Sequence, residues 1–136
     1  MPVIAPPPTP AAAGLGSELG SPFTASAGHS LADYVRWFAL EVHPLRGRDV
    51  LDVAAGMASF TAEACARKIN AVAVDPIYGA SVATLAANSE PAGLSPESEP
   101  GAPVQRFLSD YEVHFSRNRY VRAALPRLPF FDGTFD

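Results

Sequence analysis

Two aspartates and a run of small residues are the strongest candidates for a ligand site in this sequence. Asp52 lies in the apolar run 49–53, Asp75 follows the run 71–74, and the small residues 54–58 come directly after the first run. In an open parallel sheet, ligands bind beside the carboxyl ends of the strands, where both carboxylates are expected to lie. Small side chains in the turn allow a ligand to approach the backbone closely.

The surroundings of these residues favour a particular ligand chemistry. A helix expected to begin near Ser59 adds free N–H groups and the positive end of its dipole to the same edge. A carboxylate at the tip of the second strand accepts hydrogen bonds from the hydroxyls of a ribose, which is the role predicted for Asp75. The residues therefore predict a nucleoside-containing cofactor. The alternative is that Asp52 and Asp75 only cap turns at the strand ends.

Apolar periodicity predicts the elements that position this site, and it favours the fold class α/β with parallel strands. The expected strands are residues 49–53, 71–74 and 120–125. The expected helices begin at residues 30, 60, 78 and 104. For the first helix, Ser30 is the predicted N-cap with Asp33 three residues later, and His43-Pro44 and Gly47 are expected to end it.

Composition divides the chain into a tail, a foldable part and one long loop. Residues 1–28 are mostly Pro, Ala, Gly, Ser and Thr, so a disordered or extended tail is expected there, with a Pro-rich partner-binding segment as the alternative. Residues 29–136 contain the large apolar side chains and are expected to fold. Within them, the Pro-, Glu- and Ser-rich stretch 89–103 predicts an exposed loop.

Charge and composition disfavour several classes of partner. A net charge of −4 and a single lysine, Lys68, argue against direct binding of nucleic acid. No stretch approaches the roughly 20 apolar residues that cross a bilayer, so no membrane contact is expected. Cys65 is the only cysteine and the three histidines are scattered, so no metal site is expected. The chain fits a reducing, cytoplasmic environment.

Two groups of side chains allow more than one interpretation. Arg117, Arg119 and Arg122 are expected on a solvated face, and binding of an acidic group is the alternative. Tyr34, Trp37 and Phe38 are expected to pack in the core, and covering a cofactor is the alternative for them.

Three segments, in order, resemble the class I S-adenosylmethionine-dependent methyltransferases. The run VLDVAAGMASFTAEA resembles the cofactor motif of that family, VAVDP its acidic loop, and LPFFDGTFD the start of its fourth-strand motif. The resemblance covers residues 48–136. It implies a partial Rossmann-like sheet of about three parallel strands with flanking helices, S-adenosylmethionine as cofactor, and methyl transfer to an unidentified acceptor.

The resemblance also implies a role for each residue of the predicted site. Asp75 would hold the ribose hydroxyls and Pro76 would border the adenine. The residues that would line the methionine part are Asp52, Ala54, Ala55, Gly56 and Ala58. The family usually has glycine where Ala54 and Ala58 stand, so a bulkier turn and a lower affinity are expected.

The resemblance places Asp136 where the fourth strand of the family begins, so a sheet truncated before that strand is expected. The first strand would then expose an unpaired edge that a partner chain could cover. The alternative to an enzyme is therefore a truncated, inactive remnant or interaction module that retains part of the crevice. A nicotinamide-dependent dehydrogenase is disfavoured because G-x-G-x-x-G is absent after the first strand.

Overall fold

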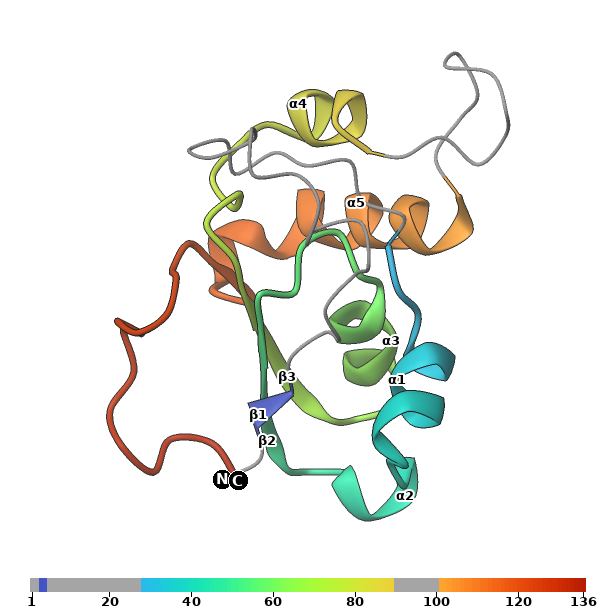
Figure 1. The fold of residues 1–136 in the computed structure, drawn as a ribbon, viewed down its shortest axis with the longest axis vertical. Helices are drawn as coiled ribbons and strands as arrows, with labels where there is room; N and C mark the ends of the chain where they lie inside the picture. The colour runs from blue at the N-terminus through green and yellow to red at the C-terminus, as the bar shows by residue number, and fades with distance from the viewer. Residues whose placement is uncertain (1–2, 5–27, 90–100) are drawn as a thin grey trace, which may run out of the picture.

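The computed structural model describes residues 3–4, 28–89 and 101–136, and a parallel sheet with the strand order β1-β2-β3-β4 forms its centre (Figure 1). The strands are β1 (Val3–Ile4), β2 (Asp49–Val53), β3 (Asn70–Val74) and β4 (Tyr120–Val121). In the long central pair, Asp52 lies opposite Ala73. The predicted α/β class and the parallel strands are confirmed.

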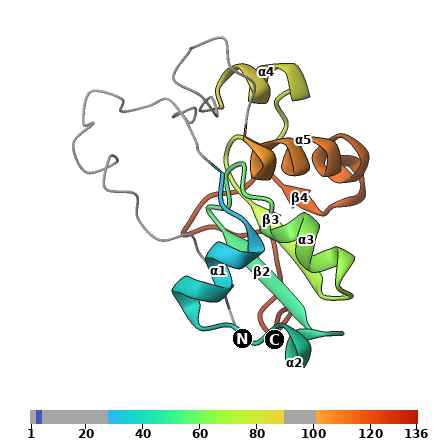
Figure 2. The same ribbon diagram turned by 90° about the vertical axis from the view of Figure 1, so that its right-hand side faces the viewer.

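The helices lie mainly on one face of the sheet. They are α1 (Leu31–Phe38), α2 (Val42–Leu45), α3 (Phe60–Ala66), α4 (Val82–Ala87), α5 (Ala102–His114) and the short 3-10 helix η3 (Phe115–Arg117). Figure 2 looks onto this face and shows α1 and α3 in front of the strands, with α5 above α3 and α4 beyond α5. The central strands are buried on both faces, which explains their nearly continuous apolar runs.

The first helix begins as predicted but ends earlier. The Ser30 hydroxyl accepts a hydrogen bond from the Asp33 N–H at 3.2 Å, and the Asp33 carboxylate accepts one from the Ser30 N–H at 3.0 Å. This capping box is confirmed. The predicted end at His43-Pro44 is wrong, because the chain leaves α1 at Ala39 in the left-handed region with φ 51°. Pro44 lies in the first turn of α2, where a missing N–H costs no helical hydrogen bond.

The segment after β4 covers the other face of the sheet (Figure 1). Phe135 is buried against Leu51, Val53 and Val74. β4 is shorter than the predicted strand 120–125, because the chain turns back and Ala124 forms an isolated antiparallel bridge with Arg127. The second face is therefore covered by a loop-like segment where the first has helices.

The outer edge of β2 is paired within the chain. Val3 and Ile4 lie opposite Leu51 and Asp52 in parallel register. Further down the strand, the Asp136 N–H donates to the carbonyl oxygen of Asp49 at 2.7 Å. The prediction of an open edge that needs a partner chain is therefore wrong at these positions.

Parts of two predicted irregular segments are regular in the structure. Within the tail predicted as disordered or extended over 1–28, residues 3–4 are extended and pair with β2 through the main chain. Helix α5 begins at Ala102, inside the loop predicted over 89–103. Residues 1–2, 5–27 and 90–100 lie outside the described part, so the remainder of both predictions falls there.

Candidate functional site

The structure brings Asp75 and the turn after β2 together at the carboxyl ends of the two central strands. One Asp75 carboxylate oxygen accepts a hydrogen bond from the Gly56 N–H at 2.9 Å, and the other accepts one from the Ile77 N–H at 3.0 Å. The Ala55 N–H donates to the carbonyl oxygen of Val74 at 3.1 Å. The turn is thus fixed against the tip of β3, at the edge where parallel sheets bind ligands.

The backbone of the turn is held in an uncommon conformation. Ala54 and Gly56 have φ values of 56° and 55°. Glycine adopts the left-handed region at little cost, whereas an alanine there costs about 1–2 kcal/mol. Strained backbone of this kind is concentrated at binding and active sites in proteins.

The side chains of the predicted turn residues point to different surroundings. Ala55 is buried with Tyr78, and Ala58 is buried with Tyr34 and Phe60 in the cluster under α1 and α3. Both contribute backbone to the edge, but their methyl groups pack into the interior. Ala54 and, at the tip of β3, Pro76 are exposed.

Asp52 is completely buried on the helix-covered face of β2. One of its carboxylate oxygens accepts a hydrogen bond from the Tyr34 hydroxyl at 2.9 Å, and Oδ1 has no partner among the described residues. Burial raises the pKa of Asp52 well above its ordinary value, the Tyr34 hydrogen bond opposes this, and the charge of Asp75 adds to it. Asp52 is therefore a carboxyl group with one unused acceptor atom at the end of a central strand.

Asp75 is half-buried and differs from Asp52 in its partners. Burial raises its pKa, and the N–H groups of Ile77 and Gly56 oppose the rise because they stabilise the charged form. A carboxylate oxygen can accept two hydrogen bonds, and each oxygen of Asp75 accepts one from the backbone. Asp75 therefore retains acceptor capacity for a ligand.

Two tyrosines support the site, and the sequence did not assign them this role. Tyr34 is fully buried and donates to Asp52, while Tyr78 is almost fully buried and donates from its hydroxyl to the Gly56 carbonyl oxygen at 2.7 Å. Burial raises the pKa of both hydroxyls, so each acts as a donor. The signal in the sequence was a tyrosine at an apolar position, because a buried hydroxyl requires a partner.

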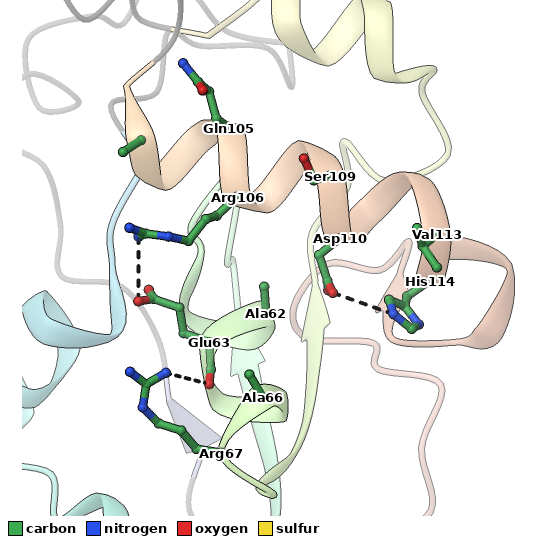
Figure 3. Close-up of a pocket in the computed structure, with 11 residues that line it drawn as sticks. Ala62, Glu63, Ala66, Arg67, Gln105, Arg106, Ser109, Asp110, Val113 and His114 are labelled. Carbon is green, nitrogen blue, oxygen red and sulfur yellow. Dashed lines mark hydrogen bonds and ion pairs between the residues drawn. The ribbon is translucent and has the colours of Figure 1, made fainter.

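A cavity of about 870 Å³ lies away from this edge, between α3 and α5 (Figure 3). Several polar side chains along it have partners within the protein. Arg106 lies 3.6 Å from the Glu63 carboxylate, and His114 lies 3.7 Å from the Asp110 carboxylate. Arg67 donates to the Glu63 carbonyl oxygen at 2.9 Å. A second cavity, of about 600 Å³, lies at the amino ends of β2 and β3. None of the predicted cofactor residues lines either cavity.

Two kinds of feature are absent from the described ranges 3–4, 28–89 and 101–136. There, no group of three or more His, Cys, Asp or Glu side chains is arranged to hold a metal ion. No helix in those ranges has the length and apolarity needed to span a membrane.

Comparison of the chain with protein-family models, with curated proteins and with solved structures returned no match.

Proposed function

We propose that this chain binds S-adenosylmethionine beside the carboxyl ends of β2 and β3, as the cofactor-binding part of a Rossmann-like class I methyltransferase. The observation that carries the proposal is the hydrogen bond from the Gly56 N–H to Asp75, which joins the small-residue turn to the acidic tip of the next strand. A strand, a tight turn, a helix and an acid on the neighbouring parallel strand are the arrangement that nucleoside cofactors use in such sheets.

The residues present fit this cofactor. Asp75 has spare acceptor capacity for the ribose hydroxyls, and exposed Pro76 can border the adenine. In this proposal the methionine part would reach the unpartnered Oδ1 of Asp52, which is completely buried in this structure, and the backbone of the turn would line the same part. The methyl group of Ala58 is buried in the interior, so of the two alanines that stand where the family has glycine, only Ala54 adds bulk at the surface.

When bound, the cofactor would supply an electrophilic methyl group on its sulfonium sulfur. The contribution of this chain would be to orient that group, since in-line transfer depends on position and needs no nucleophilic protein residue. The acceptor of the methyl group stays unassigned.

A second candidate is a catalytically inactive interaction module that retains part of the crevice. It is favoured by the position of the two cavities described above, since neither includes Asp52, Asp75 or Pro76. Binding of the cofactor separates the two candidates.

Titration calorimetry of the purified chain with S-adenosylmethionine and S-adenosylhomocysteine tests the proposal. We expect saturable binding that Asp75→Asn weakens by about tenfold or more, because a charge-assisted hydrogen bond contributes about 1.5–3 kcal/mol. Asp132→Asn, at an exposed turn, removes the same charge and should leave the affinity unchanged.

Circular dichroism establishes that each variant is folded. A folded wild-type chain that binds neither ligand would contradict the cofactor assignment and favour the interaction module. Equal affinities of the wild type and Asp75→Asn would contradict the role given to that carboxylate.

A further inference from the structure

The cavity of about 600 Å³ lies at the opposite end of the strands from Asp52 and Asp75. Three separate connections line it: the one that enters β3, the one that enters β4, and the C-terminal segment. Its volume is within the range of about 300–1,000 Å³ typical of small-molecule sites. It is therefore a candidate binding site that is independent of the function proposed above.

Basic side chains outnumber acidic ones on the rim of this cavity. Lys68 and Arg117 both line it, and within the described ranges neither side chain has a hydrogen-bonding or ion-pair partner. Arg119 also lines it, but its guanidinium is engaged by the Asp110 carboxylate at 2.8 Å. The one carboxylate on the rim, Asp49, accepts a hydrogen bond from the Asn70 side chain at 3.2 Å.

The backbone that carries Lys68 is anchored. The carbonyl oxygen of Lys68 accepts a hydrogen bond from the Gly47 N–H at 2.8 Å, and the Lys68 N–H donates one to the carbonyl oxygen of Cys65 at 3.1 Å. Arg117 is the last residue of η3, which packs beside β4. The backbone of Lys68 is thus held in place beside the cavity.

Part of the wall of the cavity is apolar. Ile69 and Phe135 are 2% and 7% exposed. Phe130 lies edge to face against Phe135, with ring centroids 4.9 Å apart. A ligand that contacts both the apolar part of the wall and the basic side chains of the rim needs an apolar body and an anionic end.

We propose that this cavity binds the phosphate monoester of a small aromatic or apolar alcohol. Such a phosphate carries a charge of about −1.5 to −2 at neutral pH, which matches the two unpaired cations Lys68 and Arg117. A carboxylate carries a single charge and would leave one cation unpaired. The planar guanidinium of Arg117 also suits two phosphate oxygens at once.

The test is a titration of the ¹⁵N-labelled full chain with phenyl phosphate, followed through the amide signals of Ile69 and Asn118. We expect saturable shifts at these amides and no shifts at Gly56 or Ile77, which belong to the other site. Phenol, inorganic phosphate and benzoate are the matched probes. Phenol lacks the anion, inorganic phosphate lacks the apolar body, and benzoate lacks the second charge, so each should bind more weakly.

Two variants remove the proposed contacts. Lys68→Asn suits the left-handed φ of 68° at this position, and Arg117→Gln is at an exposed site. Each should weaken binding of phenyl phosphate by about tenfold, the effect of losing one charge-assisted hydrogen bond. Arg127→Gln removes an exposed charge outside the cavity and should have no effect.

Several results would overturn the proposal. They are the absence of saturable shifts in the folded wild type, an equal loss in Arg127→Gln, and phenol or inorganic phosphate binding as tightly as phenyl phosphate. Shifts centred on Gly56 and Ile77 would assign the ligand to the cofactor edge and would also overturn it. The ligand panel on the wild type decides the question even if a variant fails to fold.

Discussion

Asp52 shows how a single buried group can link the fold to a binding role. Its side chain is 0% exposed and, within the part of the chain that the structure describes, Tyr34 is its hydrogen-bond partner, so ionisation inside the protein is costly. A structural cap at the end of a strand would normally satisfy both carboxylate oxygens, but Oδ1 is left over. The binding role proposed above would account for an arrangement that stability alone does not favour.

The raised pKa of Asp52 predicts a specific dependence of stability on pH. Because the folded protein binds this proton more tightly than the unfolded chain, the free energy of unfolding should fall as pH rises above the ordinary carboxyl value of 3.8. The fall should continue until the pH reaches the folded-state pKa, at about 1.4 kcal/mol for each pH unit. Asp52→Asn should flatten this dependence, because the amide does not ionise in this pH range.

Urea denaturation followed by circular dichroism at a series of pH values measures this difference. The pKa of Asp75 is raised as well, but that residue is present in both proteins, so the difference between their profiles reports Asp52. Parallel profiles for the two proteins would show that the buried carboxyl group does not limit stability.

At the scale of elements, the sequence predicted those held together by local pattern. β2, α3 and β3 lie where apolar periodicity placed them, and the capping box of α1 was visible in four residues. β1 was missed because two residues have no periodicity of their own, and only pairing with β2 makes them a strand. The early end of α1 is another case, because no helix-breaking residue marks Ala39.

The same distinction applies to the candidate site. The positions of Asp75 and the turn followed from the βαβ order, since parallel neighbours bring their carboxyl ends together. The bonds from Tyr34 and Tyr78 did not, because they join residues whose proximity depends on how helices and loops pack over the sheet. The burial of the Ala58 methyl group was equally invisible, although it bears directly on the space at the site.

Gly28 provides a test of how the elements fit together ahead of α1. Its φ is 67°, and a Cβ there would lie 2.6 Å from Val104 Cγ2 and 3.0 Å from the Met57 carbonyl oxygen. Gly28→Ala should therefore destabilise the protein by about 2–4 kcal/mol, from backbone strain together with overpacking against α5 and the turn. Gly133→Ala, with φ 77° and no neighbour within 4 Å, should cost only the strain, about 1–2 kcal/mol.

Thermal unfolding of the two variants beside the wild type measures the difference. Equal losses of stability would mean that the close approach of Gly28 to Val104 and Met57 does not constrain the fold.

At the scale of the whole molecule, the sheet is covered asymmetrically. Helices pack on the face that holds Val50 and Asp52, whereas the face that holds Leu51 and Val53 is covered by the segment after β4 (Figure 1). That segment is attached mainly through Phe130 and Phe135 and through the bond from Asp136 to Asp49. Since β2 carries Asp52, the cover on one face supports the residues of the site on the other.

Two phenylalanines of this segment test that dependence. Phe135 is 7% exposed and packs on the sheet, whereas Phe131 is 91% exposed. Phe135→Ala should lower the free energy of unfolding by about 3–5 kcal/mol, the usual cost of truncating a buried phenylalanine. Phe131→Ala should change it by less than about 0.5 kcal/mol, as surface substitutions do. Urea denaturation measures both, and light scattering should show more self-association of Phe135→Ala than of the wild type, because less of the apolar sheet face is covered. If the two variants unfold alike, the C-terminal segment is not part of the core, and β2 must be stabilised from the helix-covered face alone.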